Sequence, residues 1–175
     1  MGRAGIEAVL DLMDEAFRGR GIEESNESQS LLVNLASVPR EAWRALPVGA
    51  TRSIESIAMH VGSTKIMYDE YAFGDGRLQW SSPEVEPWPE GDARMEDVRA
   101  WLEDVQRRFV THVAALADDA ELDRMRLTNW GEHRPTRWIV AAMVTHDAYH
   151  AGEINHMRSL LGGEDRWRYI QLGLE

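Results

Sequence analysis

The sequence predicts an all-α protein whose four principal helices are expected to pack as a helix bundle. In three of these helices, residues that are mostly apolar recur at alternating spacings of three and four, which is typical of helix faces in a bundle core. No convincing pair of strands accompanies these segments. At 175 residues the chain is expected to form a single domain, 1–175, that is large enough to bury a proper core.

The N-terminal part is expected to contain a short helix and then the first principal helix. The short helix is amphipathic and covers Ile6–Phe17, and two glycines follow it closely, which favours a helix end. The next helix begins near Asn26 and runs through a leucine-rich segment. Pro39 interrupts it, and because proline is tolerated in a first helical turn, a short continuation to Leu46 is expected there.

Two longer helices are expected in the middle of the chain. Ser53 has the side chain of an N-cap for a helix that ends at Gly74. The segment 74–91 is rich in proline and glycine, so it is expected to be a long irregular loop. Asp92 then opens a helix that reaches about Ala117.

The C-terminal part is expected to contain the last principal helix. A second irregular stretch, 118–135, leads to Thr136, which is expected to cap this helix. The helix ends at the glycine pair 162–163. The tail, 164–175, is expected to lie on the surface or on a partner subunit.

The composition excludes several classes of function. The net charge is −11 and Lys65 is the only lysine, which argues against nucleic acid or an anionic membrane surface as a partner, because phosphate contacts need clustered basic side chains. No apolar run approaches the roughly 18–20 residues of a membrane span, and acids interrupt the apolar N-terminus, so we expect a soluble, cytoplasmic protein. The chain has no cysteine, so any thiol chemistry requires an external thiol.

Three histidines are the main candidates for a functional site. His146 and His150, four residues apart in the stretch HDAYH, project from one helix face, and His60 lies on the helix that begins after Ser53. The periodicity places these residues and Glu153 on core-facing stripes. Burial of such groups is costly unless they are paired or bind a metal, and three histidines leave a metal with open positions. Core histidines that hydrogen-bond to Glu153 and Thr64 remain the alternative.

Several neighbouring residues have two interpretations each. Asp147 either accepts a hydrogen bond from a ligand imidazole or is a solvent-facing acid that pairs with Arg137. Tyr149 and Trp130 are candidate substrate contacts, with aromatic packing as the alternative. His112 is expected to pack in the core, and a role as a fourth metal ligand is left open for it. His156 is expected at the surface.

The sequence around these histidines resembles the DinB/YfiT-like superfamily of metalloenzymes, which is unrelated to the DNA polymerase that shares the name. The similar segments are SIESIAMHVGSTKIMYDEYAFGD around His60 and WIVAAMVTHDAYHAGEINHMRSLLG around His146 and His150. The segment NESQSLLVNLASVPREAWRALPVGATRS is similar to the first bundle helix and connector of the family, so the resemblance covers most of 26–163. Its most specific part is HDxYHxGEIN.

The resemblance implies a four-helix bundle of up-up-down-down topology, here with an extra short N-terminal helix and two long irregular loops, and often a homodimer. It also implies a divalent metal on His60, His146 and His150. In related proteins the metal is typically nickel or zinc, so the resemblance implies one of these two, with iron or manganese as alternatives. Glu153 stands where many relatives carry Gln, and it is the candidate catalytic residue. Whether it hydrogen-bonds a ligand, carries a proton or coordinates the metal is left open.

Three functions follow from the resemblance and the histidines. Relatives include bacterial small-molecule-thiol-dependent transferases and an isomerase, so the first expectation is a metal-dependent enzyme that acts on a small molecule with a low-molecular-weight thiol. The second is a metal-dependent hydrolase, in which water replaces the thiol. The third is a non-catalytic, stress-related dimer that binds a metal in a site sealed by packed side chains.

Overall fold

The computed structural model describes residues 2–19 and 30–163. This part of the chain is mostly helical, which confirms the predicted all-α class. The α-helices are α1 (Ala4–Phe17), α2 (Leu31–Ala36), α3 (Ile54–Phe73), α4 (Met95–Ala114) and α5 (Thr136–Gly162). Two 3₁₀ turns, Arg40–Ala42 and Asp119–Asp123, lie in the connections. The expected start of the second helix and the expected surface tail lie outside the described residues.

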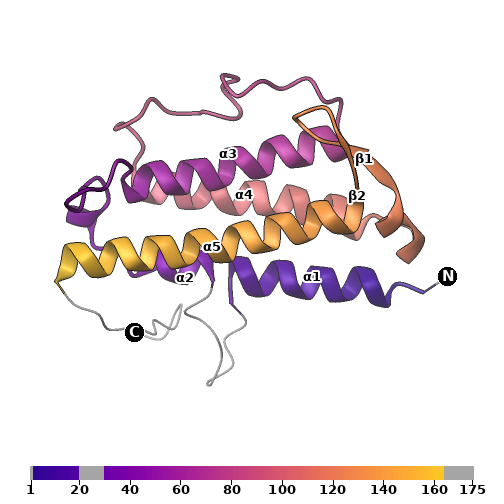
Figure 1. Ribbon diagram of the computed structural model, residues 1–175, viewed down its shortest axis with the longest axis horizontal. Helices are drawn as coiled ribbons and strands as arrows, with labels where there is room; N and C mark the ends of the chain where they lie inside the picture. The colour runs from indigo at the N-terminus through magenta and orange to yellow at the C-terminus, as the bar shows by residue number, and fades with distance from the viewer. Residues whose placement is uncertain (1, 20–29, 164–175) are drawn as a thin grey trace.

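The helices lie side by side, and α5 is the longest of those described (Figure 1). Helix α5 contacts α1, α2 and α3, while α4 packs against α3 and α1. Helices α3 and α4 run in the same direction, so the segment 74–94 between them returns along the outside of the molecule (Figure 1). Among the described residues, no helix combines the length and hydrophobicity that a membrane crossing requires. The up-up-down-down four-helix topology stays a prediction.

Helix α3 has the boundaries that the sequence predicts. The Ser53 hydroxyl accepts a hydrogen bond from the backbone N–H of Ser56 at 3.2 Å, and this satisfies a donor that the first helical turn leaves free. Gly74 follows the last helical residue. Helix α1 likewise covers the predicted amphipathic segment, and Gly19 beyond its end has a φ of 70°, which glycine adopts without strain.

The expected start of the fourth helix is wrong by three residues, since α4 begins at Met95 and not at Asp92. The Ala93 carbonyl accepts hydrogen bonds from the indole N–H of Trp43 at 3.0 Å and from the guanidinium of Arg44 at 2.9 Å. It therefore does not serve as an acceptor within the helix. The helix also ends earlier than expected, at 114. The expected continuation after Pro39 is reduced to the single 3₁₀ turn.

The expectation that no strands would pair is wrong. Strands β1 (Met125–Leu127) and β2 (His133–Pro135) form a short antiparallel hairpin within the predicted irregular stretch. Three-residue strands are too short to show an alternating pattern in the sequence. The hairpin also changes the role of Thr136, whose N–H and hydroxyl both donate to the Arg124 carbonyl, at 2.9 and 3.0 Å. Thr136 is therefore the first residue of α5 and not its cap.

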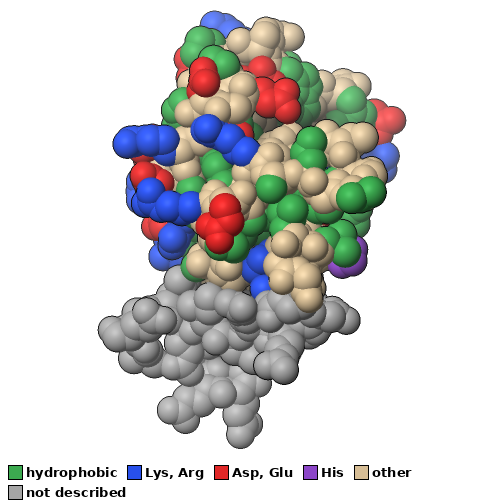
Figure 2. All heavy atoms as spheres, turned by 90° about the vertical axis from the view of Figure 1, so that its left-hand side faces the viewer, with side chains coloured by type: hydrophobic (Ala, Val, Ile, Leu, Met, Phe, Trp, Pro, Cys, Tyr) green, Lys and Arg blue, Asp and Glu red, His purple; other side chains and the backbone are tan. Residues whose placement is uncertain are grey.

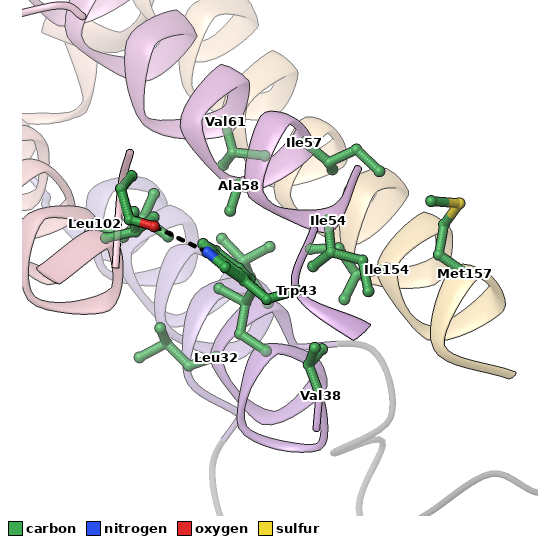
Figure 3. Packing of buried hydrophobic residues seen from close by; sticks show 14 of the residues in the cluster. Leu32, Val38, Trp43, Ile54, Ile57, Ala58, Val61, Leu102, Ile154 and Met157 are labelled. Carbon is green, nitrogen blue, oxygen red and sulfur yellow. Dashed lines mark hydrogen bonds between the residues drawn. The ribbon is translucent and has the colours of Figure 1, made fainter. Parts of the chain in front are cut away.

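The largest hydrophobic cluster surrounds Trp43, which is 5% exposed. Residues of α3, α4 and α5 meet the connector between α2 and α3 here, and Ile54, Leu102 and Ile154 lie around the indole ring (Figure 3). The dashed line in Figure 3 marks the hydrogen bond from the indole. On the surface at this end, Arg and Asp/Glu side chains are interspersed with apolar ones (Figure 2).

A buried ion pair joins the helices below the surface. The Lys65 ammonium on α3 donates to Asp147 on α5 and to Gln106 on α4, each at 2.6 Å. Gln106 donates in turn to the Met13 carbonyl on α1 at 3.3 Å, and the ammonium lies 4.7 Å from the Phe17 ring centre. Burial lowers the pKa of Lys65 and raises the pKa of Asp147, and the attraction between the two charges opposes both shifts.

Replacing Lys65 by methionine is expected to lower the free energy of unfolding by about 3–5 kcal/mol, because the Asp147 carboxylate then stays buried without its counter-charge. The double variant K65M/D147L is expected to be more stable than K65M alone, because it removes both charges. Urea unfolding of the metal-free protein measures these differences. Arg107→Met, which removes an exposed ion pair with Asp104, serves as the control and should change little. A K65M protein as stable as the wild type would show that Lys65 does not compensate the buried charge of Asp147.

Candidate metal centre

The structure brings the three predicted histidines together. His60 comes from α3, and His146 and His150 come from adjacent turns of α5. One ring nitrogen from each lies within 4.8 Å of the others, which is close enough for all three to bind one metal ion. The Nε2 atoms of His60 and His146 are 3.3 Å apart. The ring centres of His146 and His150 are 4.4 Å apart, and that of His60 lies 5.1 Å from both.

The site lies at the rim of the helix packing and not in the core. His150 is 4% exposed, His146 is half-buried and His60 is exposed. The prediction that all three face the core is therefore wrong for His60 and only partly right for His146. Helix α3 is buried along the predicted stripe at Ile57, Thr64 and Met67, and also along a second stripe through Val61 and Lys65. The periodicity of the predicted stripe is therefore right, but it does not show that His60 itself is exposed.

The surroundings of His146 and His60 favour the neutral, metal-binding form of these two histidines. Burial, followed by the charges of His150 and His60, lowers the pKa of His146 to about 3. Burial also lowers the pKa of His60, and the charges of His150 and Arg52 lower it further, while Glu153 raises it. A neutral imidazole offers a lone pair to a metal without first releasing a proton.

The Glu153 carboxylate forms a hydrogen bond with His150, one of the three histidines of the site. Its Oε2 lies 2.6 Å from the Nδ1 of His150, one helical turn away. With Nδ1–H donated to the carboxylate, the Nε2 of His150 is the nitrogen left for a metal, and the ring orientation is fixed. The Thr64 hydroxyl makes a longer contact, 3.5 Å, with the Nδ1 of His60. The hydrogen bonds to Glu153 and Thr64, which the interpretation as core histidines predicts, are therefore both present. Both involve Nδ1 atoms, so the Nε2 atoms of His60 and His150 are left for a metal.

The Nε2 atoms of His60 and His146 face each other at 3.3 Å, and a metal between them would satisfy both. The facing Nε2 atoms of His60 and His146 can share at most one proton between two neutral rings. A divalent transition metal bound by three imidazole nitrogens fits this donor set, and such a set leaves the metal its charge and open coordination positions.

Asp147 has neither of the roles that the sequence suggested. It is 2% exposed, it binds Lys65, and it does not reach Arg137, which pairs with Asp123. Sequence reasoning missed Lys65 as its partner. The available signal was compositional, since Lys65 is the only lysine in a chain that otherwise uses arginine.

His112 lies outside the site. Its Nδ1 is 2.6 Å from Asp69, and its ring stacks on Phe73 with the ring centres 5.5 Å apart, so it is not a fourth ligand here. His156 is exposed on α5, as expected. Tyr149, one of the two candidate substrate contacts, lies beside the cluster. Its ring centre is 5.0 Å from that of His150, and the residue is 71% exposed.

Trp130 packs against aromatic residues of α3 and α5. Its ring centre lies 5.5 Å from that of Tyr68 and 6.0 Å from that of Trp138. Tyr68 is two helical turns beyond His60 along α3, which corresponds to about 12 Å. A cavity of about 350 Å³ lies on another side of His60, between α3 and the loop 74–94. The sequence identified this segment as a loop but gave no sign of a cavity.

Comparison with known proteins gives one family match. The model of the DinB superfamily matches residues 25–154, a segment that includes all three histidines and Glu153. No curated protein matches the chain. The match covers most of the chain and leaves out α1 and the end of α5.

In the metal-free protein, the His146 imidazole is expected to stay neutral at pH 5, with a pKa of about 3. Between pH 6.5 and about 3 the unfolded chain then binds a proton that the folded chain does not, so stability falls as the pH falls through that window. Histidine NMR titration measures the pKa, and His146→Ala identifies the resonance. A pKa near 6.5 for His146 would rule out the buried, neutral state.

Glu153→Ala is expected to weaken metal binding by about 10–100-fold, because the Nδ1–H of His150 loses its acceptor. Glu153→Gln keeps an acceptor oxygen and is expected to lose less. Competition with a chelator measures the affinity of each variant. Glu103→Ala, on α4, removes an exposed carboxylate away from the cluster and is the control. Equal metal affinities for wild type, E153Q and E153A would show that the carboxylate does not position His150.

Proposed function

Because the chain belongs to the DinB superfamily, we propose that its three-histidine cluster is the metal centre of an enzyme that acts on a small molecule. The observation that carries the proposal is the convergence of His60, His146 and His150 at the rim of the molecule, with ring nitrogens within 4.8 Å of one another. We propose nickel or zinc as the metal, with iron or manganese as alternatives. Imidazole ligands suit nickel, zinc and iron, whereas manganese follows from the family resemblance alone.

The proposed reaction is thiol-dependent transfer or isomerisation. When bound, the metal supplies positive charge that lowers the pKa of a thiol and holds it as a nucleophile. The chain has no cysteine, so the thiol is a separate, low-molecular-weight cosubstrate. The neutral state of His146 and His60 favours metal binding near neutral pH.

The proposed roles of the surrounding residues follow from their contacts. Glu153 positions His150 through the 2.6 Å hydrogen bond, and a catalytic proton transfer by this carboxylate stays a prediction. Tyr149 and Trp130 stay proposed substrate contacts, and Tyr149 is the better placed, because its ring adjoins His150 and is exposed. We also propose the four-helix bundle of the family and a homodimer.

Two alternatives use the same cluster. In a metal-dependent hydrolase, water replaces the thiol, and substrate profiling separates the two reactions. A non-catalytic, stress-related dimer would have a sealed metal site. The exposure of His60 and the cavity of about 350 Å³ beside it favour an accessible centre and therefore an enzyme.

The central experiment measures metal content and thiol consumption on the same samples of untagged protein. Wild type is expected to contain one metal per chain and to consume a low-molecular-weight thiol in the presence of some member of a panel of electrophiles. His150→Ala is expected to lose stoichiometric metal and thiol consumption together, because one of three ligands is removed.

His156→Ala is the matched control, since it removes an exposed histidine from the same helix. It is expected to keep both metal and activity. Unchanged metal content in H150A would contradict the ligand assignment. If the metal-loaded wild type consumes no thiol with any electrophile but hydrolyses members of an ester or amide panel, the thiol reaction is wrong and the protein is a hydrolase.

A further inference from the structure

The cavity beside His60 is walled on one side by α3 and on the other by the loop 74–94. Its volume is about 350 Å³, at the lower end of the range for small-molecule sites. Two kinds of side chain dominate the wall that the loop provides, namely indole rings and carboxylates. The lining residues that matter here are Met59, His60, Trp80, Glu86, Trp88 and Glu90.

The loop wall is held in place by contacts with α3 and α4. The Ser63 hydroxyl on α3 donates to the Val85 carbonyl at 2.7 Å, and the Val85 side chain is completely buried. The Trp88 ring packs edge-to-face on Trp101 of α4, with the ring centres 5.7 Å apart. Further along, the Tyr71 hydroxyl donates to the Leu78 carbonyl at 3.2 Å. These contacts make the cavity a preformed site.

The charge of the cavity lining is negative. Glu86 and Glu90 line it, and no lysine or arginine does. Within residues 2–19 and 30–163, neither carboxylate takes part in an ion pair or a side-chain hydrogen bond. Both carboxylates are exposed and hydrated, so they attract a cation without the cost of a buried charge.

The indole rings add a second preference for cations. Trp80 is 45% exposed although it is a large apolar residue, and it lines the same cavity as Trp88. The face of an indole ring attracts a cationic group, most strongly one that is weakly hydrated, such as a substituted ammonium. Aromatic rings with nearby carboxylates are the combination that recognises such a group.

We infer that this cavity binds the cationic, substituted-ammonium part of a small-molecule substrate, between Trp80, Trp88 and the carboxylates of Glu86 and Glu90. The inference rests on the proposed function, because His60 belongs to both the cavity and the metal cluster. The other end of the substrate then reaches the histidines. The substrate class is a molecule with a cationic end and a reactive end separated by the length of the cavity.

The test compares two probes of the same shape. Choline carries a trimethylammonium group, and 3,3-dimethyl-1-butanol carries an uncharged tert-butyl group in its place. Full-length protein that has been incubated with zinc is expected to bind choline roughly tenfold more tightly than the alcohol in calorimetric titrations. The double variant E86Q/E90Q is expected to lose most of that preference, and Trp80→Leu is expected to reduce it.

Two control variants keep the test specific. Glu84→Gln removes an exposed carboxylate from the same loop that does not line the cavity, and Trp138→Leu removes a comparably exposed indole elsewhere. Both are expected to bind choline like the wild type. Equal binding of the two probes, no binding of either, or an unchanged preference in E86Q/E90Q would overturn the inference.

Metal content and thiol consumption of the same samples separate this inference from the proposed function. Intact metal binding and thiol consumption without a preference for choline would overturn the cation site alone. A choline preference that depends on Glu86 and Glu90, in a protein that binds no metal, would support the cation site and overturn the metal centre.

Discussion

The buried pair of Lys65 and Asp147 is the interaction on which the arrangement of the helices depends. It joins α3 directly to α5 at 2.6 Å, and Gln106 extends it to α4 and α1. Asp147 directly follows His146, and Lys65 lies just over one turn beyond His60. Any sliding of α3 along α5 would separate the charges and also the histidines. Because two desolvated charges add little net stability, we interpret the pair as fixing the register of the helices.

The rim position of the histidines reconciles two opposing requirements. A metal centre that reacts with small molecules needs access to solvent, which the exposed His60 provides. It also needs neutral imidazoles, and burial of the other side of the cluster provides these by lowering the pKa of His146. A cluster placed deeper in the core would be neutral but closed. A fully exposed cluster would be open, but its histidines would titrate near their usual pKa.

Local signals in the sequence were sufficient for part of the structure. The serine cap and terminal glycine defined α3, and the four-residue spacing of His146 and His150 placed them side by side. Features that depend on tertiary contacts were missed. The exposure of His60 was not predicted, because Ile57 and Thr64 on the same stripe of α3 are buried. The hairpin strands are too short to show a period, and the partner of Lys65 comes from a segment far along the chain.

The connection between α3 and α4 explains why a cavity lies next to the histidines. Parallel neighbouring helices require the chain to return along the full length of α3, whose 20 residues span about 30 Å. The segment 74–94 could reach about twice that distance if fully extended, so it has excess length that forms turns over α3. Ser63 and Trp101 hold those turns against α3 and α4. The topology therefore places this loop over His60, one of the three clustered histidines, so that a change of loop sequence can alter the lining of the cavity without altering the histidines.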